Sequence, residues 1–208
     1  MGIAWKLREM RNERRFRRER AKKGYCIYDL WAMDDWFISI IPKMLREFKE
    51  KNWCYPTLWV EEWYEQNKER CNNAGINEDN FYIVETGGNT DEQEQLRADL
   101  SHYQSNKWKE ILDRMIFLFE ESNEETCKKK NPYEEEHSKQ FSIDLPDRFF
   151  SKKELRERKK NPPQRDEEAY EKLCKAYQEE DLKLEEYREQ CEKEAIELFV
   201  KYLHNLWW

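Results

Sequence analysis

The clearest hydrophobic pattern in the chain runs over residues 30–50, where apolar side chains recur every three to four positions. At about 100° per residue, this spacing places on one broad helix face Leu30, Met33, Phe37, Ile40, Ile41, Met44, Leu45 and Phe48. Asp34 falls inside this face, between Ile41 and Leu45, whereas Asp35 falls on the polar side. Since an isolated ionised carboxylate in a dry core costs several kcal/mol, we expect Asp34 to have a partner, a proton or a ligand.

The same spacing predicts helices elsewhere, and turn-forming residues are scarce. Only five Gly and six Pro occur in 208 residues, which favours long helices over sheets, because sheets need many turns. The last predicted helix, over 165–206, would be about 60 Å long at 1.5 Å per residue, so we expect its first half to protrude or to pack on another chain. The sequence therefore predicts an all-α fold, a compact helical bundle with a long C-terminal helix and a basic N-terminal arm, with a core of helices 29–51, 57–73, 91–122 and 185–208.

Charge and proline content divide the chain into four segments. Residues 1–24 hold ten Lys/Arg and three Asp/Glu, a net charge of +7, whereas the other 184 residues carry −14. A basic arm on an acidic body can bind polyanions or fold back onto its own body. We expect a basic arm at residues 1–24 and a helical core at 25–122. A charged irregular insertion with a brief helix near 152–159 follows at 123–164, and a long helix at 165–208 completes the core.

The overall composition is polar but rich in aromatic rings. Forty per cent of residues are charged and the mean hydropathy is −1.21, values typical of disordered chains. Nine Trp, eleven Tyr and ten Phe are nevertheless enough to build a compact core. The six cysteines form no CxxC pair, and neither a signal peptide nor a membrane-spanning segment is recognisable, so we expect reduced thiols in a cytoplasmic protein.

The motifs of common enzymes and metal sites are missing from the sequence. His102, His137 and His204 fall in no metal-ligand spacing. The Gly87-Gly88 pair lacks the following Lys-Ser/Thr of a phosphate-binding loop, and no Ser lies in a nucleophile elbow. The sequence therefore predicts no catalytic residues, no metal and no cofactor.

Three interpretations of Asp34 follow from its predicted burial. It is a structural acid, bonded to the Trp108 indole or paired with Arg97, since buried polar groups are usually satisfied within a fold. Alternatively, it anchors a ligand on which tryptophan rings stack, and the ligand-binding residues are then Trp31, Asp34, Trp36 and Trp108. A desolvated aspartate with a raised pKa also suits general acid–base catalysis in a small hydrolase.

The arginines of the N-terminal arm are candidate nucleic-acid-binding residues. They can neutralise phosphates, and Trp5 and Phe16 can stack on exposed bases, whereas the interspersed Glu9, Glu13 and Glu19 oppose this interpretation. A solvated helix, or an arm docked on the acidic body, is the alternative. The predicted nucleic-acid contacts are Arg14, Arg15, Arg17, Arg18 and Arg20.

A family resemblance rests on five blocks of sequence: YDLWAMDDWF at 28–37, IPKMLREFKE at 41–50, the pair Tyr55-Pro56, WKEILDRMI at 108–116 and FVKYLHNLWW at 199–208. These blocks, at most about a third of the chain, resemble a group of uncharacterised small helical proteins encoded by tailed bacteriophages and prophages. Members of that group usually have shorter connections, and a glycine where this chain has Cys54. The resemblance implies a viral, helical protein in the host cytoplasm, and it implies no activity.

Together these observations predict a phage accessory protein that acts by binding. It would sequester a small molecule or a host protein, for instance during host takeover or counter-defence. The alternative is a nucleic-acid-binding accessory factor that uses the arginine-rich arm. We expect no membrane partner, and we expect a homodimer through the C-terminal helix. Trp207 and Trp208 are expected to fold back beside Trp31 or Trp53, or to bury in a second subunit.

Overall fold

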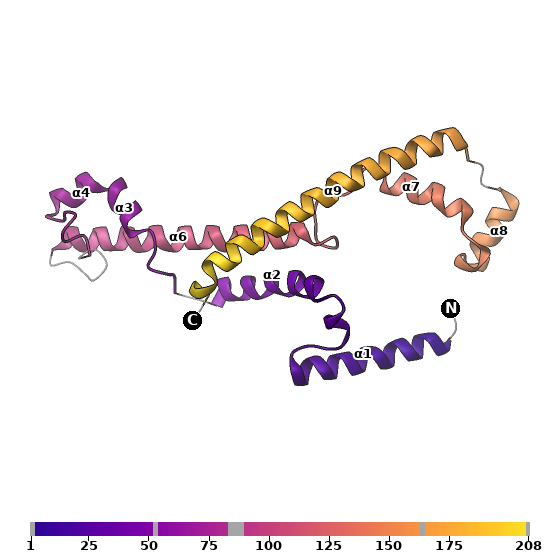
Figure 1. Ribbon diagram of the computed structural model, residues 1–208, viewed down its shortest axis with the longest axis horizontal. Helices are drawn as coiled ribbons and strands as arrows, with labels where there is room; N and C mark the ends of the chain where they lie inside the picture. Colours follow the sequence, from indigo (N-terminus) through magenta and orange to yellow (C-terminus); the bar gives the residue numbers. More distant parts are fainter. Residues whose placement is uncertain (1–2, 52–53, 83–89, 163–164, 207–208) are drawn as a thin grey trace. The chain divides into compact units, whose positions relative to one another are not determined.

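The computed structural model describes residues 3–51, 54–82, 90–162 and 165–206, and all regular structure within these ranges is helical (Figure 1). Eight α-helices are described: α1 Ile3–Lys23, α2 Met33–Lys51, α3 Val60–Gln66, α4 Lys68–Asn73, α6 Asp91–Ser122, α7 Glu134–Phe141, α8 Lys152–Lys160 and α9 Glu167–Tyr202. Four short 3₁₀ helices accompany them: η1 Tyr28–Leu30, η2 Ser142–Asp144, η3 Asp147–Phe149 and η4 Leu203–Asn205. The predicted all-α class and the long C-terminal helix are confirmed.

Two helical segments differ from their prediction. The predicted helix over 57–73 is divided at Asn67, whose side-chain amide donates to the carbonyl of Trp63 at 2.9 Å. Such local side-chain bonds compete with the regular helix pattern. The segment 123–164 is more helical than predicted, because it contains α7, α8 and two 3₁₀ helices. Helix α8 begins with a capping box between Ser151 and Glu154, in which each side chain accepts from the other residue's amide.

The chain divides into two compact units, which are described separately. Unit 1 comprises Met1–Glu120 and Glu194–Trp208, and unit 2 comprises Glu121–Lys193. Helices α6 and α9 therefore contribute residues to both units. A single compact bundle is not confirmed by this division. The expected fold-back of Trp207 and Trp208 lies outside the described residues.

The core of unit 1 forms where α2, α6 and the last turns of α9 lie side by side (Figure 1). The Phe37 ring meets Phe119 edge-on at 6.0 Å and Phe199 at 5.8 Å between ring centroids. Trp108 meets Tyr202 in the same way at 5.7 Å. These ring contacts join α2, α6 and α9 in one aromatic core of unit 1.

A second core within unit 1 lies where α3 and α4 pack on the start of α6. Its buried residues are Trp63, Tyr64, Cys71, Ile76, Leu96 and Leu100. Helix α4 ends at Asn73, and Gly75, two residues further on, has a positive φ of 76° that allows the chain to reverse. The amide of Ile76 then donates to the carbonyl of Cys71 at 2.8 Å.

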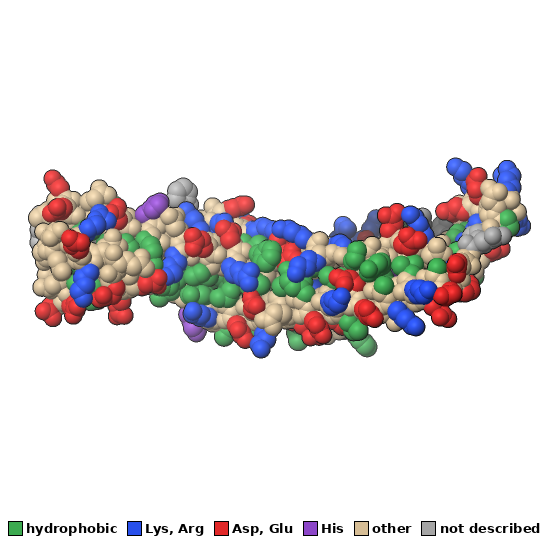
Figure 2. All heavy atoms as spheres, turned by 90° about the horizontal axis from the view of Figure 1, so that it is seen from above, with side chains coloured by type: hydrophobic (Ala, Val, Ile, Leu, Met, Phe, Trp, Pro, Cys, Tyr) green, Lys and Arg blue, Asp and Glu red, His purple; other side chains and the backbone are tan. Residues whose placement is uncertain are grey.

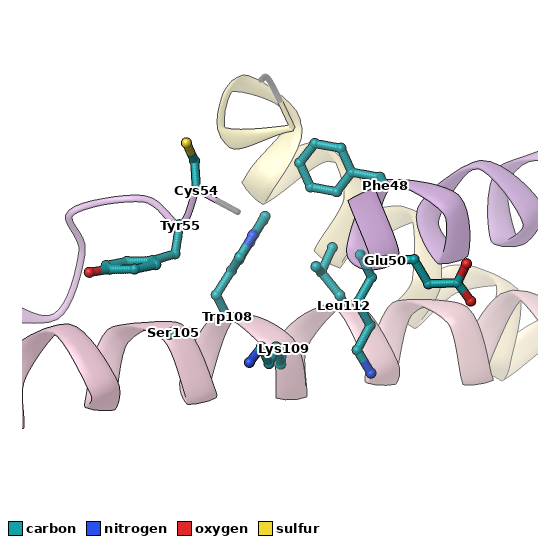
Figure 3. A pocket seen from close by; sticks show the side chains of 9 residues that line it. Phe48, Glu50, Cys54, Tyr55, Ser105, Trp108, Lys109 and Leu112 are labelled. Atoms are coloured by element: carbon teal, nitrogen blue, oxygen red, sulfur yellow. The ribbon is translucent and has the colours of Figure 1, made fainter. Parts of the chain in front are cut away.

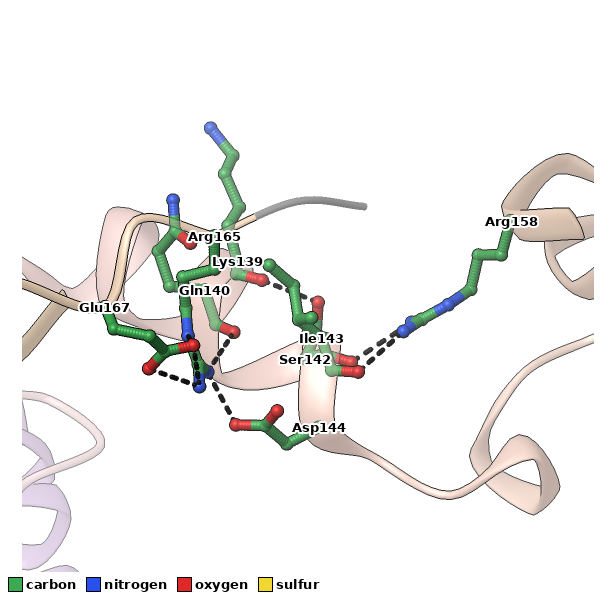
Figure 4. Close-up of polar contacts among 8 residues, drawn as sticks. All are labelled: Lys139, Gln140, Ser142, Ile143, Asp144, Arg158, Arg165 and Glu167. Carbon is green, nitrogen blue, oxygen red and sulfur yellow. Dashed lines mark hydrogen bonds and ion pairs between the residues drawn. The ribbon is translucent and has the colours of Figure 1, made fainter. Parts of the chain in front are cut away.

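Two arginines of unit 2, Arg158 and Arg165, bond to the segment that follows α7 (Figure 4). Arg158 donates to the carbonyls of Ser142 and Ile143, at 3.0 and 2.8 Å. Arg165 donates to the carboxylates of Asp144 and Glu167, at 2.5 and 3.0 Å. Because the carbonyls at a helix end have no partner within the helix, these bonds fix the segment that follows α7.

The part of the surface seen in Figure 2 carries acidic and basic side chains interspersed with small apolar patches. None of the described helices is both long enough and apolar enough to cross a membrane.

Candidate functional site

The structure places the four predicted ligand-binding residues in different surroundings. Asp34 is exposed, Trp31 is 87% exposed and Trp36 is half-buried, whereas Trp108 is 3% exposed in the core. The prediction that Asp34 is buried is therefore wrong, and the structure does not enclose the four predicted ligand-binding residues in one pocket.

The physical reason is the position at which α2 begins. The helix begins at Met33, so Asp34 lies in its first turn, where unpaired amide groups favour a negative charge. The buried face of α2 begins only at Ile38 and continues through Ile41, Pro42 and Leu45. The predicted apolar face was too wide, because three of its members, Leu30, Met33 and Met44, are exposed.

The buried carboxylate in this region belongs to Asp29, which is 5% exposed. Its Oδ2 accepts from the Cys26 amide at 2.7 Å and from Arg20 Nε at 2.9 Å, and its Oδ1 accepts from Arg20 Nη2 at 2.5 Å. The two-pronged bond to the Arg20 guanidinium holds the pKa of the Asp29 carboxyl well below its usual range. The same bond raises the pKa of Arg20.

This network attaches one side of α1 to the turn that follows it. The amide of Ile27 donates to Glu19 at 3.2 Å, and the rings of Phe16 and Tyr28 lie 6.2 Å apart. Together with the Arg20–Asp29 pair, these contacts occupy the side of α1 that carries Phe16, Glu19 and Arg20. The other side of the helix is left facing solvent.

The solvent-facing side of α1 is strongly basic. Five exposed cations fall within an arc of about 100° at 3.6 residues per turn: Arg11, Arg14, Arg15, Arg18 and Lys22. We call these five residues the basic face of α1. Among them, Arg15 lies 3.8 Å from Glu19, a loose pair of the kind that contributes little to stability.

The basic face includes three of the five predicted nucleic-acid contacts, namely Arg14, Arg15 and Arg18. Arg17 lies beside the face and approaches Glu13 at 3.9 Å, while Arg20 is committed to Asp29. The sequence prediction did not include Arg11 and Lys22. Arg11 lies seven residues before Arg18 and Lys22 lies four residues after it, a spacing that places all three on one helix face.

The turn after α1 displays apolar side chains instead of burying them. Five residues are 49–87% exposed, and we call them the exposed turn: Ile27, Tyr28, Leu30, Trp31 and Met33. The bonds of Asp29 hold this segment between the end of α1 and the start of α2 (Figure 1). Because exposed apolar patches usually mark contact surfaces, the exposed turn is a second candidate site.

A second buried acid, Glu121, lies in unit 2 and is 2% exposed. Its carboxylate accepts from the Lys128 amide at 3.2 Å, from the Tyr187 hydroxyl at 3.1 Å and from the Cys127 thiol at 3.7 Å. Burial raises the pKa of the Tyr187 hydroxyl and of the Cys127 thiol, so both stay protonated at neutral pH. A protonated thiol is a poor nucleophile, and the network is a structural one.

A pocket of about 340 Å³ in unit 1 adjoins Trp108 (Figure 3). Three rings line it, those of Phe48, Tyr55 and Trp108, together with the charged side chains of Lys49, Glu50 and Lys109. The ammonium of Lys49 lies 2.5 Å from the carboxylate of Asp113 and pairs with it. Lys109 is therefore the better candidate to pair with an anionic group of a ligand. Of the four predicted ligand-binding residues, Trp108 alone lines this pocket.

Within the described part of the chain, no group of three or more His, Cys, Asp and Glu side chains could hold a metal ion. Comparisons of the chain with protein-family models, with curated proteins and with solved structures found no match.

Proposed function

We propose that the protein is a phage accessory protein that acts by binding, and that its partner is nucleic acid held by the basic face of α1. The observation that supports this proposal best is the clustering of Arg11, Arg14, Arg15, Arg18 and Lys22 on the side of α1 that the turn leaves open. The family resemblance supports the accessory role.

The dimensions of the basic face suit a phosphate backbone. From Arg11 to Lys22 the helix rises about 16 Å at 1.5 Å per residue. Double-stranded DNA presents about one charge per 1.7 Å of its axis, so each of the five cations has a phosphate within reach. Such contacts bind without reading sequence, and we therefore expect affinity without strong sequence preference.

The Asp29–Arg20 pair contributes by holding α1 in a defined orientation. Without it, the helix could turn its cations toward the other 184 residues of the chain, whose net charge of −14 attracts them. The pair keeps Phe16 and Glu19 against the turn and the cations away from it. Catalysis has no part in this proposal.

The test is a salt titration of binding to random-sequence DNA and RNA. Wild-type affinity is expected to fall steeply with salt, with a slope up to about −4.5 for five phosphate contacts. Replacing Arg11, Arg14 and Arg18 with serine is expected to weaken binding and to reduce the slope by about 1 for each cation removed.

The matched control replaces three exposed lysines of α9, namely Lys172, Lys175 and Lys183, so that the change in net charge is the same. These substitutions are expected to leave the slope near its wild-type value. Equal weakening by both sets would show that only net charge matters and would contradict a role for α1, as would a wild-type protein that does not bind.

A second candidate function is sequestration of a small molecule in the pocket beside Trp108. Its three rings and Lys109 suit a planar aromatic ligand with an anionic group, for which a nucleoside monophosphate is the probe. We expect the probe to raise the melting temperature and the Lys109→Ala variant to lose most of that rise. Lys193→Ala is the control, since Lys193 is also exposed. If the probe leaves the melting temperature unchanged, the pocket does not bind it and this second function is excluded for nucleoside monophosphates.

A further inference from the structure

The exposed turn combines a large apolar centre with flanks of opposite charge. Trp31 is 87% exposed and Tyr28 is 63% exposed, an unusual position for rings of this size. Exposed Lys22 and Lys23 precede the turn at the end of α1, and exposed Asp34 and Asp35 follow it at the start of α2. The basic flank and the acidic flank therefore lie at opposite ends of one apolar segment.

We infer that the exposed turn is a dimer interface whose occupant is the same surface of a second copy of this chain. A two-fold axis through the apolar centre, perpendicular to the line between the flanks, places Lys22 and Lys23 of each copy opposite Asp34 and Asp35 of the other. The apolar residues of the two copies then meet at the axis. A surface with a basic flank on one side of its centre and an acidic flank on the other is complementary to the same surface rotated by 180°. This self-complementarity favours a second copy of the chain as the partner.

The available area also fits a second copy. Aromatic residues each bury about 150–250 Å², so Trp31 and Tyr28 supply a large share of the roughly 800 Å² per partner in a standard interface. Ile27, Leu30 and Met33 add aliphatic surface around the rings. Aliphatic side chains do not stack on bases, so this composition favours a protein partner over nucleic acid.

The surface is already ordered in the single chain. The carboxylate of Asp29 bonds Cys26 and Arg20, so little conformational freedom remains to be lost when the turn is covered. Preorganisation of this kind increases affinity. The inference does not rest on nucleic-acid binding, although Lys22 belongs both to the basic face and to the basic flank, because the apolar centre of the interface is the exposed turn.

The first test is sedimentation analysis of the full chain across micromolar concentrations. Wild type is expected to show a concentration-dependent monomer–dimer equilibrium. Trp31→Ala is expected to raise the dimer dissociation constant at least about thirtyfold, the size of effect that defines a hot-spot residue. Leu30→Ala is expected to weaken the dimer as well, whereas Leu182→Ala is expected to leave it unchanged. Leu30 and Leu182 are a matched pair, at 53% and 60% exposure.

The second test exchanges charges between the flanks. A Lys22→Glu/Lys23→Glu variant and an Asp34→Lys/Asp35→Lys variant are each expected to lose self-association, since like charges then face each other. Their mixture is expected to form heterodimers, because each altered flank meets its complement. Circular dichroism and thermal melting establish that each variant is folded.

Three results would overturn the inference. One is a wild-type protein that stays monomeric at every concentration. This result contradicts the inference even if the exposed turn binds a different protein. Another is a dimer that persists in Trp31→Ala, as expected if the contact lies on the C-terminal helix. The third is a mixture of folded charge variants that forms no heterodimer.

Discussion

Replacing Asp29 with alanine is expected to cost about 3 kcal/mol, at the low end of the roughly 3–5 kcal/mol measured when a buried ion pair is broken. The substitution leaves the buried Cys26 amide without its acceptor, and it releases Arg20, which is 45% exposed and can be partly rehydrated. We expect the loss of stability to appear as faster amide hydrogen exchange at Cys26 and Trp31, because α1 detaches from the turn.

Asp34→Ala is the matched control for this substitution. Asp34 is exposed in the first turn of α2, so its removal is expected to cost less than about 1 kcal/mol, the scale of an exposed charge at a helix N-terminus. The sequence predicted that Asp34 is the buried acid of this region. If Asp34→Ala proves to be the more damaging change, the described turn is incorrect.

The contribution of Asp29 depends on pH with a definite sign. Because the folded-state pKa of this carboxyl is depressed, its stabilising effect is fully present above the unfolded value of about 3.9. The effect is lost progressively as the pH falls from there toward the folded-state pKa. The difference in stability between wild type and Asp29→Ala is therefore expected to shrink in acid.

Phe119→Ala is expected to lower the free energy of unfolding of unit 1 by about 3–5 kcal/mol, as for other large-to-small core changes. The ring is 0% exposed and lies 6.0 Å from Phe37 and 6.1 Å from Phe199, so its removal opens a cavity between three helices. Denaturant unfolding, followed by tryptophan fluorescence, measures the loss.

Phe117→Ala is the matched control, since Phe117 lies on the same helix two residues earlier and is 37% exposed. We expect it to cost less than about 1 kcal/mol, as surface substitutions usually do. Similar losses in the two variants would contradict the assignment of the buried face of α6.

Periodicity was a sufficient guide to the long helices. Helix α6 has the predicted bounds of 91 and 122, because its apolar positions keep one spacing over many turns. The pattern failed at the start of α2, where Leu30 and Met33 continue the apolar spacing although no neighbouring helix covers them. Spacing alone does not show where a packing partner ends.

The elements of the candidate site were harder to predict for a different reason. The Arg20–Asp29 pair joins residues nine positions apart across the Gly24 turn, a separation that no helical or strand period marks. Glu121 is buried by the loop that contains Cys127 and Lys128, and the residue pattern of α6 does not reveal that this glutamate is buried. Polar networks that join a helix to a loop depend on loop geometry, which residue patterns do not encode.

The attachment of α1 to the exposed turn depends most on a buried, ionised Asp29. The direct measurement is an NMR titration of the Asp29 side-chain carboxyl carbon in the intact protein. The carboxyl is expected to remain ionised as the pH falls through the ordinary aspartate range near about 3.9, and to protonate only in stronger acid. Titration at the ordinary value would show a solvated, unpaired carboxylate and would contradict the anchored arrangement.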